Sequence, residues 1–145
     1  MAEAGLFVGW GAPVRGREIA GLGVFNEAIQ WWGSQQGDGA IESFDVVILE
    51  PHGGDLAGFF LIRGTEDQIA AVRASDDYAR LITRAGMIVE RVGSVGAFLG
   101  DGLGPAVERY QAAASEFGGC GGPIPRPPRR SRGRAAVRAR PRRRP

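Results

Sequence analysis

The charge of the chain changes abruptly near Phe117, and this break limits how much of the sequence can fold. Residues 1–118 contain 8 Arg and 16 Asp or Glu, a net charge of −8, whereas residues 119–145 contain 10 Arg and no acid. The second stretch also holds 6 of the 9 prolines and no aromatic residue. Such a segment cannot bury enough apolar area to offset the entropy of ordering. We therefore expect one folded domain over 1–118 and a disordered Arg/Pro-rich tail over 119–145.

The tail allows three interpretations. A run of Arg binds RNA or DNA without sequence specificity and with strong salt dependence, so nucleic-acid binding through the tail is one hypothesis. The tail could also fold back on the acidic body. Arg, Pro, Ala and Gly are, moreover, the residues that an out-of-frame GC-rich message encodes, so a reading-frame artefact is the third. The body itself disfavours nucleic acid, because phosphate contacts require positive charge.

The composition excludes several kinds of site. Cys120 is the only cysteine, which excludes an internal disulfide and any multi-cysteine metal site. The glycine-rich segments 9–16 and 100–105 lack the spacing of phosphate-binding loops and dinucleotide fingerprints, so we expect neither a metal nor a cofactor. The N-terminus lacks the basic region of a signal peptide, and no stretch approaches the ~20 apolar residues of a membrane span. A cytoplasmic protein without membrane contact is the expectation.

Apolar periodicity predicts the elements of the body. Strands are expected over 6–10, 41–50, 56–63 and 87–92, with 93–99 as a bent extension of the last, and helices over 18–36, over 66–84 and from Pro105 onward. The spacing of Thr65 and Gln68 indicates a capping box. A second N-cap at Ser75 predicts that 66–84 forms two short helices.

Two helices carry apolar stripes that should face the core. In the first helix the stripe is Ile19, Leu22, Phe25, Ile29 and Trp32, and in the last it is Val107, Tyr110, Ala114 and Phe117. Residues at three- and four-residue steps lie on one side of a helix. Both stripes are therefore predicted to be buried.

The predicted order is β-α-β-β-α-β followed by a C-terminal helix, which is the ferredoxin-like α+β pattern. One antiparallel sheet would carry both main helices on one face. Apolar side chains are expected on the other face as well, so that face should also be covered. In a small domain the usual cover is the sheet of a second copy, and a homodimer is therefore predicted.

The hairpin IESFDVVILEPHGGDLAGFFLIRG and the helical segment EDQIAAVRASDDYARLI resemble the dimeric α/β-barrel superfamily. That superfamily includes small antibiotic-biosynthesis-type monooxygenases and stress-responsive barrel proteins, and the chain is more narrowly similar to a group of uncharacterised bacterial proteins of this architecture. The resemblance covers about residues 5–117 and is one of pattern, not of a catalytic motif. It implies sheet-to-sheet pairing and a cavity between sheet and helices that takes small, apolar or aromatic molecules.

His52 and Asp45 are the candidate catalytic residues. His52 is the only histidine, and an imidazole can act as a base near neutral pH; the alternative is an exposed turn residue. Asp45 would have a raised pKa if its strand faced a cavity, and Arg63 or Arg91 could pair with it. The alternative for Asp45 is a structural ion pair.

Trp10, Asn26, Trp31 and Arg63 are the candidate ligand-binding residues. Trp31 lies off the apolar stripe of its helix, so it could line a pocket or cover a partner, although packing explains most such rings. Asn26, Trp31 and His52 are the residue types that some haem-degrading barrels combine. The loop position of His52 departs from that pattern and argues against haem.

Three functional hypotheses follow. The first is a small-molecule-binding barrel that acts without a cofactor if it is an enzyme. The second is a non-catalytic dimeric interaction module, and the third is nucleic-acid binding through the tail. Fold alone does not choose between the first two.

Overall fold

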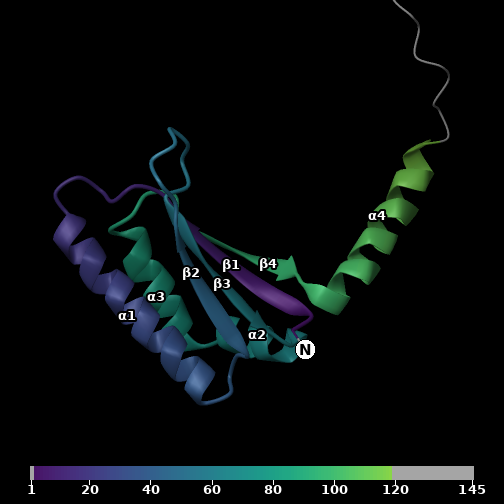
Figure 1. The fold of residues 1–145 in the computed structure, drawn as a ribbon, viewed down its shortest axis with the longest axis horizontal. Helices are drawn as coiled ribbons and strands as arrows, with labels where there is room; N and C mark the ends of the chain where they lie inside the picture. Colours follow the sequence, from purple (N-terminus) through teal and green to yellow (C-terminus); the bar gives the residue numbers. More distant parts are fainter. Residues whose placement is uncertain (1, 119–145) are drawn as a thin grey trace, which may run out of the picture.

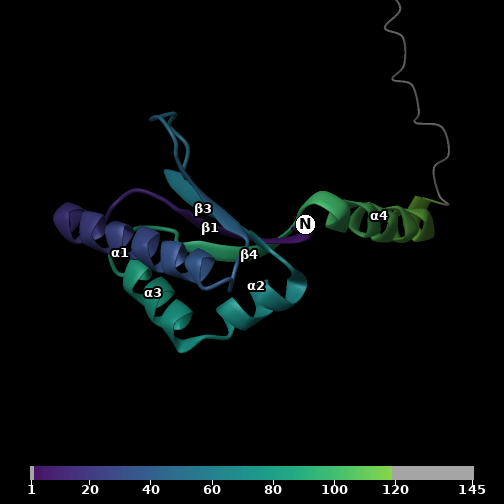
Figure 2. The ribbon, with the colours of Figure 1, turned by 60° about the horizontal axis from the view of Figure 1, so that its bottom comes forward.

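The computed structural model describes residues 2–118, and the predicted tail over 119–145, with Cys120, lies outside the described residues. In chain order the elements are β1 (Ala4–Trp10), α1 (Glu18–Gly37), β2 (Ser43–Ile48), β3 (Gly58–Gly64), α2 (Glu66–Arg73), α3 (Asp76–Gly86), β4 (Gly93–Phe98), a short 3-10 turn (Gly100–Gly102) and α4 (Leu103–Phe117). Helices α1, α2 and α3 lie on one face of the sheet (Figures 1 and 2).

The four strands form one sheet in the order β2-β3-β1-β4, and every neighbouring pair is antiparallel. In its register Leu6 lies opposite Ile62, and Phe7 lies between Leu61 and Val95. This strand order with these connections is the ferredoxin-like fold, so the predicted fold class is confirmed. The sheet of one chain is open and does not close into a barrel.

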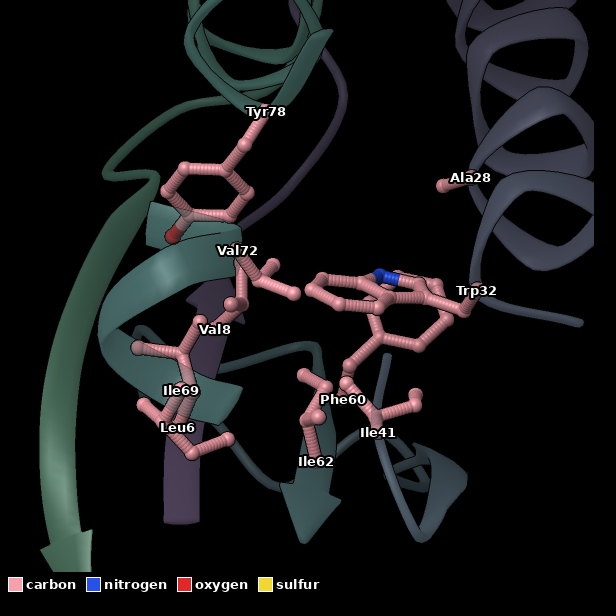
Figure 3. Packing of buried hydrophobic residues seen from close by; sticks show 10 residues of the cluster. All are labelled: Leu6, Val8, Ala28, Trp32, Ile41, Phe60, Ile62, Ile69, Val72 and Tyr78. Carbon is pink, nitrogen blue, oxygen red and sulfur yellow. The ribbon is translucent and has the colours of Figure 1, made fainter. Parts of the chain in front are cut away.

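The core lies between the sheet and its three helices (Figure 3). Trp32 of α1 is only 1% exposed and projects toward the strands. Its indole lies among buried residues of the sheet and of α2 and α3; these are Leu6, Val8, Phe60, Ile62, Ile69, Val72 and Tyr78. The alternation of β1 and β3 explains why Leu6, Val8, Phe60 and Ile62 are buried, because every second side chain of a strand points to the same face.

Helices α2 and α3 begin at the predicted caps. Thr65 accepts a hydrogen bond from the Gln68 N–H, and Gln68 accepts one from the Thr65 N–H, which completes the capping box. Ser75 accepts from the Tyr78 N–H at the start of α3. The division of 66–84 into two helices is thus confirmed, because each serine or threonine satisfies a backbone donor that the helix leaves free.

The fourth strand is displaced from its predicted place. Residues 87–92 form no strand; Val89 makes only an isolated bridge to Pro13, and Arg91 adopts a left-handed φ of 54°. The partner of β1 is instead 93–98. An extended run cannot pass through a left-handed residue, so the chain turns at Arg91 and pairing begins only after it.

Of the two predicted inward stripes, the one in α1 is correct only in part and the one in α4 is wrong. In α1, Trp32 is buried and Phe25 and Ile29 pack partly buried against the core, but Ile19 is 83% and Leu22 60% exposed. Val24 and Ala28, outside the predicted stripe, are the other buried residues of this helix. In α4 no residue is buried, and Phe117 is 84% exposed. Figure 1 shows why, since α4 leaves the end of β4 and extends away from the body.

Candidate functional site

An apolar cavity of about 400 Å³ lies between α1, α3 and the sheet. Its walls come from the strands Val8, Trp10 and Phe60, from α1 at Val24, Phe25, Ala28 and Trp32, and from α3 at Leu81, Ile82 and Ala85. The segment after α3 closes one side with Ile88, Val89 and Val92. The cavity therefore shares part of its wall with the protein core.

Three aromatic rings from three elements form one wall. The Trp10 centroid lies 5.0 Å from that of Phe60 and 5.9 Å from that of Phe25, and the Phe25 and Phe60 centroids are 5.9 Å apart. Trp10 reaches this wall because it follows Leu6 and Val8 at two-residue steps on β1. Such spacings are those of favourable aromatic pairs, so the cluster is a rigid apolar surface.

Glu18 is the only ionisable group among the described residues that line the cavity. It is the first residue of α1, and its Oε1 accepts a hydrogen bond from the Gly16 N–H at 3.1 Å. Its own backbone N–H and that of Gly16 stabilise the charged form and lower the pKa of the Glu18 carboxyl. Leu22 and Ile48, which line the cavity too, are exposed. We identify this carboxylate and the two aliphatic side chains as the mouth.

His52 lies outside the cavity lining, in the loop between β2 and β3. The Gly54 N–H donates to Nδ1 of His52 at 3.2 Å, so Nε2 carries the proton and donates to the Leu56 carbonyl at 2.9 Å. The ring is exposed, and both of its nitrogens are engaged within its own loop. The His52 side chain therefore holds together the backbone of its own loop.

Asp45 and Arg63 form an ion pair on the sheet face opposite the helices. Asp45 lies opposite Leu61, whose side chain alternates with the buried Phe60 and Ile62. The pair is partly exposed, and Arg91 pairs with Asp55 instead. The structure therefore brings Asp45 and Arg63 together, but on the far side of the sheet from the cavity.

Of the predicted ligand-binding residues, Trp10 alone is part of the cavity lining. The Trp31 ring packs against Trp32 at 4.5 Å and against Tyr78 at 6.2 Å between centroids, and Asn26 is exposed on α1. Phe60 and Leu81 also line the cavity, although the sequence did not predict them as cavity residues. They carry the same apolar signal as core residues, and no sequence pattern separates a filled core from a hollow one.

No group of three or more His, Cys, Asp or Glu side chains that could hold a metal ion is present in residues 2–118. Within that same part of the chain, no helix has the length and apolar character to cross a membrane.

No known family model matches the sequence, and no curated protein matches it. Among solved structures, the chain is similar to a dimeric protein of unknown function with a ferredoxin-like fold from Bacteroides fragilis NCTC 9343. The TM-score is 0.49 at 9% identity, over 66% of this chain and 96% of that one. It is also similar to a protein assigned as an antibiotic biosynthesis monooxygenase from Chloroflexus aurantiacus J-10-fl. There the TM-score is 0.45 at 11% identity, over 68% of this chain and 95% of that one. The ferredoxin-like fold follows from the strand order and connections of this chain itself.

Proposed function

We propose that this protein binds a small, largely apolar or aromatic molecule in the cavity between α1, α3 and the sheet. The observation that carries the proposal is the cavity itself: about 400 Å³ lined almost entirely by apolar side chains. Small-molecule sites are typically concave, mostly apolar and about 300–1,000 Å³ in volume. Protein interiors otherwise contain few voids larger than a water molecule.

The lining suggests the shape and polarity of the ligand. The Trp10–Phe25–Phe60 wall offers aromatic faces for stacking. Glu18 at the mouth offers one charged acceptor. An aromatic or aliphatic body with a hydrogen-bond donor at one end would use both features, because the apolar part loses water and the donor keeps a partner.

Catalysis by His52 and Asp45 is a separate hypothesis that this geometry does not favour. Neither residue belongs to the cavity lining, and a general base must lie within hydrogen-bond reach of its substrate. Binding without catalysis is therefore the function that the described residues support best.

The test is binding of the neutral fluorophore N-phenyl-1-naphthylamine to the full chain. Gly21 lines the cavity, and a Cβ placed there meets no atom within 4 Å. Gly21→Leu should therefore insert a side chain into the cavity and weaken binding at least about tenfold. Gly33 lies on the same helix, also has open space around its Cβ, and is outside the lining, so Gly33→Leu is the matched control and should bind as the wild type does.

Equal affinity of the two variants would contradict the proposal, because the dye would then bind elsewhere on the surface. Absence of binding to the wild type, together with no ligand in the purified protein by mass spectrometry, would also contradict it.

We also propose that the protein is a homodimer. The sheet face opposite the helices carries partly exposed apolar residues, including Phe7, Phe59 and Val95. Nothing in the described part of the chain lies over it (Figure 2). An apolar face of this kind is typical of a contact with another protein.

A further inference from the structure

We propose that α4 is an exchanged arm: in the homodimer its apolar stripe packs on the open sheet face of a second copy of this chain. This inference rests on the homodimer proposed above and adds the element that makes the contact. It is independent of the ligand cavity, which lies on the other face of the sheet.

Helix α4 has an apolar stripe with no partner in the described chain. The stripe consists of Leu103, Val107, Tyr110, Ala114 and Phe117, all exposed, with Tyr110 at 75%. Their alternating steps of four and three residues repeat over two heptads, the spacing of helices that pack on a neighbour along one side. An isolated helix of 15 residues is marginally stable in water. We therefore expect the stripe to pack on another surface that stabilises the helix.

The segment that joins β4 to α4 directs the helix away from its own sheet. The Leu99 N–H donates to the Glu3 carbonyl at 3.1 Å, and a Cβ at Gly102 would lie only 2.1 Å from the Glu3 carbonyl oxygen. Gly100 adopts a left-handed φ of 46°. The connection is thus packed tightly against the start of β1, and folding α4 back onto its own sheet would break these contacts.

The contact that α4 makes with an aromatic ring of its own body, among the described residues, also leaves the stripe free. The Arg109 guanidinium lies 5.2 Å from the centroid of the Phe98 ring. At about 100° per residue, Arg109 lies on average about 120° around the helix from the five stripe residues. The side of α4 that meets its own chain is therefore not the apolar side.

The open sheet face supplies a surface of matching character. Strand alternation places Phe7, Val47, Phe59, Leu61 and Val95 on this face. The Phe7 and Phe59 rings are in contact, with centroids 5.0 Å apart, and Val95 is 59% exposed. These side chains form an apolar strip across all four strands, which the Asp45–Arg63 ion pair borders on β2 and β3 of the same face.

The dimensions of the two surfaces agree. A 15-residue helix is about 22 Å long, and strands of six or seven residues are about 20–23 Å long. Within residues 2–118, each copy has one uncovered helix stripe and one uncovered sheet face, so a two-fold axis satisfies both surfaces twice. Two such contacts bury on the order of 1,000 Å², which is near the lower bound of a specific interface.

A matched pair of substitutions tests the arm. Ala114 lies within the stripe, and Ala112 lies about 180° around the helix from the stripe centre. Ala114→Asp and Ala112→Asp are the same chemical change on the same exposed helix, and they differ only in the face they alter. In sedimentation velocity on the full chain, Ala114→Asp should raise the dimer dissociation constant by more than about 100-fold, whereas Ala112→Asp should leave it unchanged.

A mixed disulfide identifies the partner surface. In a Cys120→Ser background, one chain carries Val95→Cys and the other carries Tyr110→Cys. Mild oxidation of the mixture should give a cross-linked heterodimer, because Val95 lies on the open face and Tyr110 in the stripe.

The outcomes separate this inference from its premises. A wild-type chain that is monomeric at about 100 µM overturns both the homodimer and the arm. A dimer that survives Ala114→Asp and gives no heterodimeric disulfide overturns the arm alone and indicates direct sheet-to-sheet packing. Cross-links only between two Tyr110→Cys chains indicate α4–α4 pairing and overturn it as well. None of these results alters the dye-binding test of the cavity.

Discussion

The same substitution, Gly→Ala, is expected to have opposite effects in α1 and in β3. Gly33 lies in α1, and a Cβ built there meets no atom within 4 Å. Gly58 begins β3, and its Cβ would lie 2.6 Å from the Val47 carbonyl oxygen and 2.7 Å from Cζ2 of Trp10. The change is identical in the unfolded chain, so the difference between the two variants reports on the folded structure alone.

The magnitudes follow from these two environments. Ala is favoured over Gly in a helix interior by about 0.8–1.0 kcal/mol, and nothing at Gly33 opposes that gain. At Gly58 the added methyl group must displace either a strand carbonyl or the Trp10 ring, and overpacking of this kind costs about 1–3 kcal/mol. The two variants should therefore differ by about 2–4 kcal/mol in free energy of unfolding.

Urea unfolding followed by far-ultraviolet circular dichroism is the suitable assay, because Trp fluorescence would respond to movement of Trp10 itself. With a slope of about 2 kcal/mol/M, Gly33→Ala should raise the midpoint by about 0.5 M and Gly58→Ala should lower it by about 0.5–1.5 M. Protomer concentration must be held constant, because dimerisation stabilises the folded state by mass action.

A second helix site provides the internal control. Gly23 has equally open space at its Cβ and lies about 15 Å along α1 from Gly33. The gains of Gly23→Ala and Gly33→Ala should therefore add. If Gly58→Ala proves neutral, the Trp10 ring does not rest against the backbone as described, and the aromatic wall of the cavity is wrongly placed.

Further predictions concern Tyr78 and the start of α3. The Tyr78 hydroxyl donates to Oγ of Ser94 at 2.5 Å, so Tyr78→Phe should lower the free energy of unfolding by about 1 kcal/mol in a urea titration at neutral pH. Burial raises the pKa of the Tyr78 phenol despite the hydrogen bond to Ser94. Because the unfolded phenol loses its proton first, near pH 10, stability should fall as pH rises above about 10. Tyr78→Phe should lose less stability than the wild type over this pH range. Equal pH profiles of the two proteins would refute the raised pKa of Tyr78. Ser75→Ala should lower the free energy of unfolding by about 1 kcal/mol in the same urea titration, because the N-cap of α3 is lost. Ser75→Asp should retain most of this stabilisation, because Asp is also a good N-cap residue.

The parts of the fold that depend on local signals could be predicted from the sequence. The helix boundary at Ser75 and the capping box at Thr65 follow from side chains that satisfy neighbouring backbone groups. The order of strands and helices follows from two well-separated periodicities. From that order the antiparallel four-stranded sheet follows almost directly, because few other topologies accommodate it.

The place of the fourth strand and the residues that line the cavity could not be predicted in the same way. Residues 87–92 are apolar enough for a strand, but pairing with β1 depends on the turn at Arg91 and begins at Gly93. The apolar pattern predicts Phe25 and Phe60 only as core residues, but both line the cavity as well. Whether helices meet a sheet closely or leave a space depends on how their axes are placed, and periodicity carries no information about that.

From the sequence alone, the charge break predicts a folded body over 1–118, and the apolar patterns identified most of the helices and strands and the apolar character of both sheet faces. Only the tertiary structure decided which apolar surfaces are covered within one chain. It directs α4 away from the body through a connection packed against β1, and it leaves the stripe and the open sheet face exposed together. The physical reason is that burial depends on contacts between distant segments, whereas a sequence pattern records only which side of an element avoids water.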